Sequence, residues 1–424
     1  MSGREEFISK TLLVVGGGIE AVPGLQKAKA LGLHVAVSDT NPDAPGFRCA
    51  DDRILASTYD IEQTVSEARR YHRAVRPIDG VMCIASDIPL TVASVAHSLN
   101  LPTIPLEAAR LASDKLAMKR KFAADGVPVP WFAALNSAVQ LKASARDRAF
   151  PLVIKPVDSR GARGVLRLTA GQDLDEAFAL AVKESPTGRV MVEQFLDGPQ
   201  VSTESIVLDG VAHTPGFADR NYELLGKYAP HIVEDGCDLP SILGVEQQES
   251  VRRIVQQAAL SMGIRNGVVK GDIVVCSGKA YVIELAARLS GGLLCSDLIP
   301  LNTGVEFVEC AIRLALGETV SPLDLVPRYQ HCVCQRYLFP RPGRVVRIAG
   351  EEDVRRQPGV VFCQVRVGIG SRVGPMNSHP ARAGMVIAVG ESRQQAIQRA
   401  QAAVQTIQIE TVPTESGAEA GAKR

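Results

Sequence analysis

The sequence lacks an excess of charge of either sign. It carries 47 Lys and Arg against 46 Asp and Glu, a net charge of +1 across 424 residues. A chain so balanced presents no overall field for nucleic acid or an anionic membrane surface, and it holds no local run of like charges. It also lacks any run of about 18 apolar residues, the length that spans a membrane. We therefore expect neither nucleic acid nor membrane among its partners.

Cysteine is present but shows no organised spacing. Nine cysteines are scattered along the chain without a Cys-x-x-Cys pair, so neither a disulfide framework nor a zinc clip is indicated. The N-terminal stretch MSGREEFISK has no apolar segment typical of a secretion leader. This cysteine usage is typical of a reducing compartment, and we expect a cytoplasmic protein.

What the sequence does have is a pattern of predicted strands and helices that changes along its length. Residues 11–110 alternate short apolar strands with amphipathic helices, which predicts a parallel, doubly wound, Rossmann-like α/β domain over 1–112. A mixed α+β region follows over 113–325. Short strands dominate a β-rich domain over 326–412, and the small, polar segment 413–424 is expected to be a disordered tail.

A glycine triplet at 16–18 follows the first strand and precedes a helix, with Asp39 at the end of the second strand. This is part of a dinucleotide-binding fingerprint. The run GGGIEAVPG, however, lacks the G-x-G-x-x-G spacing, and Pro23 stands where the helix begins. We prefer a tight turn of a Rossmann-like fold, and nicotinamide binding stays open as the alternative.

Two lysines and a glycine-rich loop form an ordered series. Lys115 follows a Ser-Asp helix cap, Lys155 ends the apolar run PLVIKP, and the loop DSRGARGV with Gly161 and Gly164 comes directly after. Glycines let backbone N–H groups approach phosphate oxygens, and lysines add positive charge. Each feature alone is more typical of a surface lysine or a hairpin turn, but the series predicts a clamp for phosphates.

The stretch VMVEQFLDG places Glu193 in an otherwise apolar strand, followed by Phe195 and Leu196. An adenine ring needs an apolar slot with backbone donors and acceptors at its edge, which a strand leaving a core supplies. A strand with one outward polar residue is an equally good interpretation of this stretch alone.

The runs GDIVV and YVIEL, joined by CSGKA, predict a β-hairpin. A three-residue loop, Ser277 to Lys279, would place Asp272 directly opposite Glu284 on one face. Two facing carboxylates are destabilising without a cation between them, and Mg²⁺ bridged by phosphates is the natural one. A two-residue loop would place the acids on opposite faces, as ordinary solvated residues.

Taken in order, these features resemble the ATP-grasp superfamily over nearly the whole chain. The resemblance implies a pre-ATP-grasp domain, an ATP-grasp domain with a lid at about 128–200, and the β-rich C-terminal domain. It also implies ATP and Mg²⁺, with Mn²⁺ possible, as cofactors, and a homodimer. By resemblance, Lys115, Lys155 and the glycine loop hold phosphates, residues 193–196 frame adenine, Gln200 meets the ribose, and Asp272 and Glu284 bind the metal.

Two departures from the usual ATP-grasp pattern indicate which group within the superfamily this chain resembles. Many members carry a metal-binding Asn two residues after the second acid, where this chain has Ala286. Biotin carboxylase follows its matching arginine with Gln-Val-Glu and has a lysine near the place of His231, whereas here Arg288 is followed by Leu-Ser-Gly. The pattern ELAARLSGG is most similar to carboxylate-amine ligases of the L-amino acid ligase type.

That resemblance implies an ADP-forming ligase that joins a small carboxylic acid, in some members an amino acid, to an amine through an acyl phosphate. Arg288 would hold the reacting carboxylate or the oxyanion, and its alternative is a structural pair with Glu284. Lys227, His231 and Glu234 are further candidates for substrate recognition. An ATP-grasp carboxylase and a nucleotide-binding regulator without turnover stay open as other functions.

Overall fold

The computed structural model describes residues 9–413; of the predicted tail, residues 414–424 lie outside this part. The chain divides into two compact units. The first contains the described residues up to Ala134 with Glu193–Asp219 and Pro240–Gln330, and the second contains Leu135–Val192, Arg220–Leu239 and the chain from His331 onward. The expected domain boundaries at 112 and 325 stay predictions.

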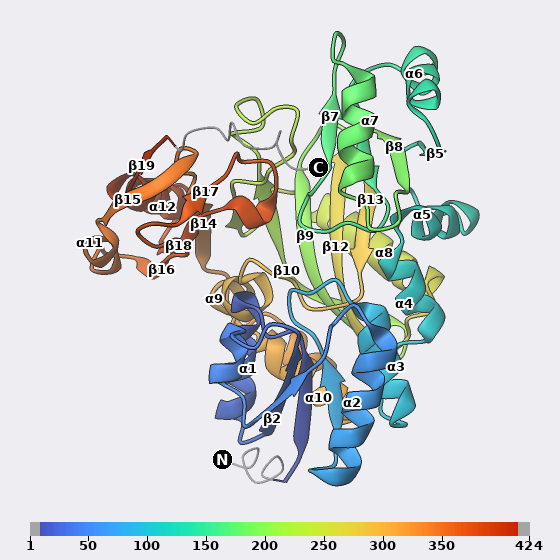
Figure 1. The fold of residues 1–424 in the computed structure, drawn as a ribbon, viewed down its shortest axis with the longest axis vertical. Helices are drawn as coiled ribbons and strands as arrows, with labels where there is room; N and C mark the ends of the chain where they lie inside the picture. Colours follow the sequence, from blue (N-terminus) through green and yellow to red (C-terminus); the bar gives the residue numbers. More distant parts are fainter. Residues whose placement is uncertain (1–8, 414–424) are drawn as a thin grey trace, which may run out of the picture. The chain divides into compact units, whose positions relative to one another are not determined.

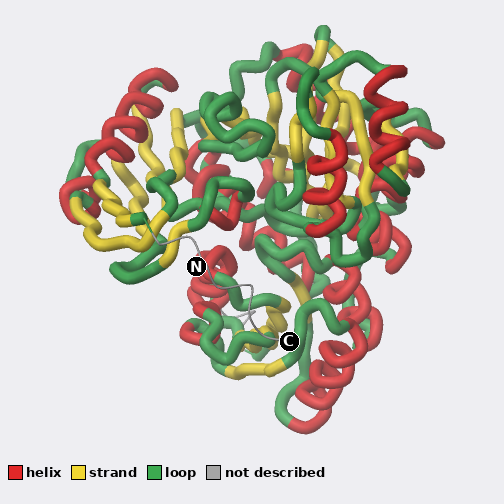
Figure 2. The backbone as a smooth tube through the Cα atoms, turned by 45° about the horizontal axis from the view of Figure 1, so that its top comes forward, coloured by secondary structure: helices red, strands yellow, loops and turns green. Residues whose placement is uncertain are grey.

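The first unit begins with a four-stranded sheet of order β3-β2-β1-β4 in which every pair is parallel. Helix α1 lies on one face of this sheet, and α2 and α3 lie on the other (Figures 1 and 2). The predicted α/β, Rossmann-like fold is therefore confirmed. The elements are β1 (Thr11–Val15), α1 (Val22–Ala30), β2 (His34–Asp39), β3 (Asp52–Leu55), α2 (Ile61–Ala74), β4 (Gly80–Met82) and α3 (Pro89–Ser98).

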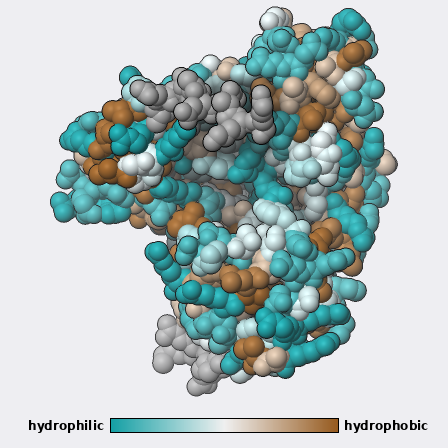
Figure 3. All heavy atoms as spheres, in the orientation of Figure 1, coloured by the Kyte–Doolittle hydropathy of each residue, from teal (hydrophilic) through white to brown (hydrophobic). Residues whose placement is uncertain are grey.

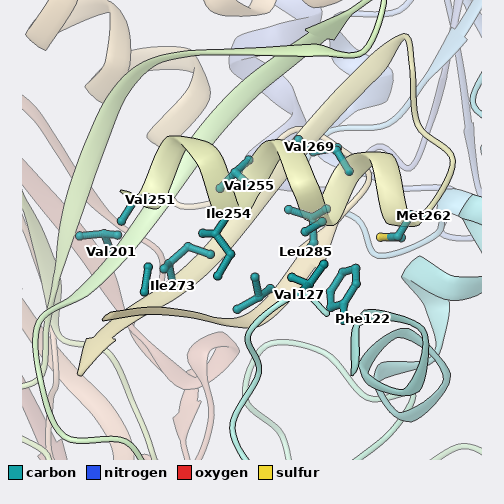
Figure 4. Packing of buried hydrophobic residues seen from close by; sticks show 14 of the residues in the cluster. Phe122, Val127, Val201, Val251, Ile254, Val255, Met262, Val269, Ile273 and Leu285 are labelled. Atoms are coloured by element: carbon teal, nitrogen blue, oxygen red, sulfur yellow. The ribbon is translucent and has the colours of Figure 1, made fainter. Parts of the chain in front are cut away.

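The same unit holds four antiparallel strands in the order β13-β12-β9-β10. Apolar residues of α8 and α5 pack on one face of these strands; Figure 4 shows Ile254 near Ile273, and Phe122 beside Val127. Phe122 is fully buried, and its truncation to alanine would cost about 3–5 kcal/mol. The elements are α4 (Leu106–Ser113), α5 (Lys115–Ala124), β9 (Gln200–Leu208), β10 (Val211–Asn221), α8 (Val245–Ser261), β12 (Gly267–Cys276), β13 (Lys279–Ala286), α9 (Ile299–Thr303) and α10 (Phe307–Ala315).

The second unit contains β6, β7 and most of β8, from a sheet of order β5-β8-β6-β7, and a β-rich C-terminal region. In that region α12 packs against β14 and β18 through its buried alanines, as at Ala396 and Ala400. The predicted β-rich character is confirmed. The elements are β5 (Phe132–Leu135), α6 (Ala138–Asp147), β6 (Leu152–Pro156), β7 (Leu166–Leu168), α7 (Leu174–Lys183), β8 (Val190–Gln194), β11 (Gly236–Leu239), β14 (Cys332–Tyr337), β15 (Gly343–Ala349), α11 (Glu351–Arg355), β16 (Val360–Val365), β17 (Arg372–Val373), β18 (Gly384–Gly390), α12 (Arg393–Thr406) and β19 (Gln408–Val412).

The surface is mixed in character. On the face drawn in Figure 3, hydrophobic residues stand singly or in small groups among hydrophilic ones. Scattered exposed apolar residues are ordinary for a folded chain. Within residues 9–413, none of the helices has the length and apolar character needed to cross a bilayer.

Candidate active site

The β12–β13 hairpin places the two predicted metal-binding acids opposite each other. Its turn has two residues, Ser277 and Gly278, both at positive φ, and Cys276 pairs with Lys279. A regular ladder from this turn would put Asp272 and Glu284 on opposite faces. The register shifts next to Asp272, however, so that Ile283 is an extra residue on β13 and Asp272 pairs with Glu284. A β-bulge thus overturns the consequence expected of a two-residue loop.

Lysines accompany both acids. The Nζ atom of Lys115, in the first turn of α5, lies 3.3 Å from Glu284 Oε1. The Nζ atom of Lys270, two residues before Asp272 on β12, contacts Asp272 Oδ1. Ser202 of β9 donates its hydroxyl to the same Asp272 oxygen at 2.7 Å. The like charges of the acid pair are therefore compensated by cations that the chain itself supplies.

Glu204 lies on the same face of the sheet as Lys270 and Asp272, and sequence reasoning missed it. It is fully buried on β9 directly opposite Lys270, and its Oε1 accepts the Ser290 N–H at 3.1 Å. Burial raises the pKa of Glu204 to about 7, although Ser290, Lys270 and Arg288 act in the opposite direction. Perturbed carboxyl groups of this kind concentrate at functional sites.

Arg288 is held by Asp87, in the loop between β4 and α3, rather than by Glu284. Its Nε donates to Asp87 Oδ1 at 2.6 Å, and its Nη1 donates to the Leu289 carbonyl. Burial disfavours the charge, but Asp87 outweighs this and raises the pKa of Arg288. The alternative of a structural pair with Glu284 is thus replaced by a pair with Asp87, and the guanidinium stays charged at all working pH values.

The glycine triplet after β1 joins this site. Gly17 and Asn41 donate their N–H groups to the Asp39 carboxylate, at 2.8 and 2.9 Å. Glu20, just after the triplet, accepts the Gly292 N–H at 2.7 Å. Asp39 therefore fixes the turn, as the preferred interpretation expects, and Glu20 ties this turn to the Ser-Gly-Gly turn beyond Arg288.

The predicted adenine residues begin with a buried ion pair. The Oε2 atom of Glu193 lies 2.9 Å from the Nζ atom of Lys119, and the two side chains are 4% and 1% exposed. The Glu193 carboxylate is thus directed into the protein, so the interpretation as an outward polar residue is wrong, whereas an adenine site framed by residues 193–196 stays a prediction. Phe195 and Leu196 are half-buried after β8, and Gln200 opens β9 opposite Val274.

In the second unit, Lys155 lies near the end of β6 and is 4% exposed. Strands β6 and β7 pair antiparallel, so the loop 158–165 closes a hairpin. Gly161 and Gly164 both have positive φ, and a Cβ on Gly164 would come within 2.8 Å of Glu184 Cβ. Asp158 accepts the Ser185 hydroxyl at 2.6 Å, which anchors the start of the loop.

The predicted substrate segment lies along this hairpin. Leu166 forms a bridge with His231, and Arg167 donates its N–H to the Pro230 carbonyl at 2.7 Å. Burial lowers the pKa of His231. Lys227 lies over the Tyr228 ring.

Glu234, near the end of that segment, lies between two arginines of the second unit. Arg220 Nη2 is 3.0 Å and Arg382 Nη2 is 3.8 Å from Glu234 Oε2. The C-terminal region also contacts the glycine loop, because His379 donates its N–H to the Gly161 carbonyl at 2.9 Å. Of the three substrate candidates, Glu234 is the one enclosed by cations.

The acid pair fits a magnesium ion that takes the rest of its ligands from a nucleotide. Asp272 and Glu284 face each other, and among the described residues no cluster of three or more His, Cys, Asp and Glu side chains forms a complete protein cage. Mg²⁺ prefers one or two carboxylates together with phosphate oxygens and water. Ala286 supplies no ligand and stands opposite Lys270 in the ladder.

Sequence reasoning missed Lys119, Lys270, Glu204 and Asp87. Lys270 carried a signal, since it alternates with Asp272 on one strand and so must share its face. Lys119 also carried one, because it lies one helical turn after Lys115. Asp87 and Glu204 carried none, because their partners are distant in the sequence.

Three family models match the chain in succession. Residues 25–103 match the ATP-grasp N-terminal domain, 112–292 the ATP-grasp domain, and 336–412 the L-amino acid ligase C-terminal domain 2. The chain therefore belongs to the ATP-grasp superfamily of ADP-forming ligases, whose cofactors are ATP and Mg²⁺ or Mn²⁺. Within it, the chain carries the C-terminal domain of the L-amino acid ligases.

Similar proteins agree with this placement. The chain is 28% identical over 390 residues to an uncharacterised protein, y4rH, of Sinorhizobium fredii, covering 90% of this chain and 79% of the relative. It is 25% identical over 244 residues to a D-alanine--D-alanine ligase of Acidovorax ebreus, covering 55% and 72%. The name of the second relative states a ligase, whereas the name of the first states no activity.

Solved structures share the fold. The L-amino acid ligase of Bacillus licheniformis superposes with a TM-score of 0.81 at 21% identity, covering 95% of this chain and 99% of that one. A biotin carboxylase of Campylobacter jejuni superposes with a TM-score of 0.70 at 20% identity, covering 95% and 92%. At these identities the likeness establishes the fold and leaves the substrates open.

Proposed function

We propose that this protein is an ADP-forming carboxylate-amine ligase, which joins a small carboxylic acid to an amine through an acyl phosphate. The observation that carries the proposal is the bulged register that sets Asp272 opposite Glu284 with a lysine on each acid. Such a face suits a nucleotide triphosphate with its metal. The L-amino acid ligase C-terminal domain favours an amine as the second substrate.

The reaction has two displacements. A carboxylate oxygen of the acid forms a bond to the γ-phosphorus as the bond to the β-phosphate oxygen breaks, and ADP leaves. The amine nitrogen then bonds to the carbonyl carbon, the carbon–oxygen bond to phosphate breaks, and the nitrogen loses its proton to solvent. Because anions must approach one another, charge neutralisation supplies most of the catalysis.

The residues of this chain supply that neutralisation. We assign phosphate contacts to Lys115 and Lys155 and to the backbone N–H groups of the loop with Gly161 and Gly164. Asp272 and Glu284 would hold Mg²⁺, which lowers the charge on the transferred phosphoryl group. Residues 193–196 and Gln200 are assigned to the nucleoside by family resemblance.

Arg288 is the proposed catalytic arginine. Its guanidinium is permanently charged, 12% exposed, and oriented by Asp87 and the Leu289 carbonyl. A planar fork held in this way suits a carboxylate or the oxyanion that forms when the amine attacks. The low exposure of the Arg288 side chain strengthens the electrostatic field of its guanidinium. The part that remains exposed is enough for contact with a small substrate.

Carboxylation is the competing function, and the residues after Arg288 argue against it. The segment Leu289 to Gly291 replaces the Gln-Val-Glu of biotin carboxylase, and Leu289 is buried in a bridge with Ile84. The segment 289–291 therefore carries no carboxylate of its own to act on bicarbonate. We also propose a cytoplasmic homodimer: free thiols at all nine cysteines support the location, and a biotin carboxylase domain dimer among the similar structures supports the assembly.

The test is incubation with ATP, Mg²⁺, hydroxylamine and a panel of small carboxylic acids, amino acids included. We expect hydroxamate and ADP in equal amounts, because hydroxylamine traps an acyl phosphate. AMP in place of ADP would contradict the proposal. A parallel reaction with bicarbonate and biotin separates the carboxylase, which would release ADP there and make no hydroxamate with the acid panel.

A further inference from the structure

Lys270 has no part in the mechanism above, yet it lies on the face of the sheet that carries Asp272 and Glu204. Its ammonium contacts Asp272, its own side chain is 15% exposed, and in the two ladders it stands opposite Glu204 on one side and Ala286 on the other. The alanine offers no polar group and little bulk. The lysine side chain therefore has one carboxylate along its strand and a second across the sheet.

The second carboxylate has an oxygen to spare. Oε1 of Glu204 accepts the Ser290 N–H, but Oε2 is buried and receives no hydrogen bond from any described residue. A buried carboxylate oxygen without a donor is costly. Directly opposite residues have Cβ atoms about 4.5–5.5 Å apart, well within the reach of a lysine side chain.

The charged side chains around Asp272 suggest that Lys270 can exchange one carboxylate partner for another. Glu284 pairs with Lys115, Asp272 with Lys270, and Arg288 with Asp87, which leaves Glu204 as a fourth carboxylate beside three cations. A divalent cation on Asp272 would repel the ammonium already there, because both are positive and share one carboxylate. Glu204 is the acceptor that the fold places within reach.

We propose that Lys270 and Glu204 set the metal affinity of Asp272. Lys270 is the counter-ion of Asp272 in the metal-free chain, and it moves to Glu204 when a divalent cation binds. Both are positioning residues that act through Asp272. The inference rests on the metal role that the proposed function gives to Asp272.

The test is calorimetric titration with ADP in the absence and presence of Mn²⁺. The Kd for ADP without Mn²⁺ divided by the Kd with Mn²⁺ measures the metal contribution, and a larger ratio means tighter metal binding. Lys270→Met should increase this ratio about tenfold, because the competing cation is gone. Glu204→Gln should decrease it several-fold, because Lys270 loses its alternative carboxylate. Lys279→Met, an exposed lysine at the turn of the same hairpin, is the matched control and should match the wild type.

A purely structural role would weaken metal binding in both variants, so the opposite directions are decisive. The double variant Lys270→Met, Glu204→Gln should match Lys270→Met alone, since Glu204 acts through the lysine. If Asp272→Asn leaves the Mn²⁺ contribution unchanged, the metal role in the proposed function is wrong. If Asp272→Asn abolishes it and the two single variants shift in the same direction, the exchange is wrong and the proposed function stands. Thermal melting checks that each variant folds.

Discussion

Two hairpins carry the predicted ATP-site groups, and they place them differently. The β12–β13 hairpin has a two-residue turn and presents side chains from the middle of its strands, Asp272 and Glu284 among them. The β6–β7 hairpin has a long loop whose proposed phosphate-binding groups are backbone N–H groups around Gly161 and Gly164. In the first, position depends on strand register; in the second, it depends on glycine conformation. The two should therefore fail in different ways.

The largest effect should come from the strand-borne acids. Glu284→Gln keeps the shape but removes the charge that balances Lys115 and binds the metal, so ATP turnover should fall about 100- to 1,000-fold. ADP release measures it, with Glu246→Gln, an exposed acid in the first turn of α8, as control. Full turnover in Glu284→Gln would contradict the metal assignment.

The buried acid on the same face predicts a pH dependence of stability. Burial raises the pKa of Glu204 from 4.5 to about 7, so its contribution to the free energy of unfolding is present below pH 4.5 and lost as pH rises through 7. The wild type should lose about 3 kcal/mol relative to Glu204→Gln between these limits. Urea unfolding at several pH values measures it; parallel curves for the two proteins would refute the raised pKa.

The loop hairpin should respond to backbone strain. Gly164→Ala places a side chain at φ 69° and against Glu184 and Pro156, so we expect a loss of about 2 kcal/mol and weaker ATP binding. Gly126→Ala is the matched control, with φ 74° and open space around its Cβ, and should cost about 1 kcal/mol. Equal losses in the two variants would show that the close packing of the loop is unimportant.

The smallest effect should come from the residue that orients Arg288. Asp87→Asn keeps an oxygen acceptor and loses the charge, so kcat/KM for the carboxylic acid should fall about tenfold while KM for ATP stays constant. Steady-state kinetics check it, with Glu107→Gln, an exposed acid paired with Arg110, as control. A rise in KM for ATP instead would assign Asp87 to nucleotide binding.

Local features were predictable from the sequence. The Ser-Asp helix cap before Lys115 was expected, and Asp114 accepts the Ala117 N–H at 2.9 Å at the start of α5. The parallel sheet, the hairpin and the glycine loop were also expected, because each follows from nearby residues. The Asp87–Arg288 pair was not, since its members lie 201 residues apart and no local pattern connects them.

The sequence by itself contains the ordered series of lysines, glycines and acids, and this series was enough to indicate the superfamily. Only the tertiary structure decided that the two acids of the β12–β13 hairpin lie on the same face of the sheet. The turn alone would have separated Asp272 from Glu284, and the bulge at Ile283 brings them together because one extra residue reverses which face a strand presents. The same packing placed Lys270 between Asp272 and Glu204, since the order of strands in a sheet is set by contacts far apart in sequence.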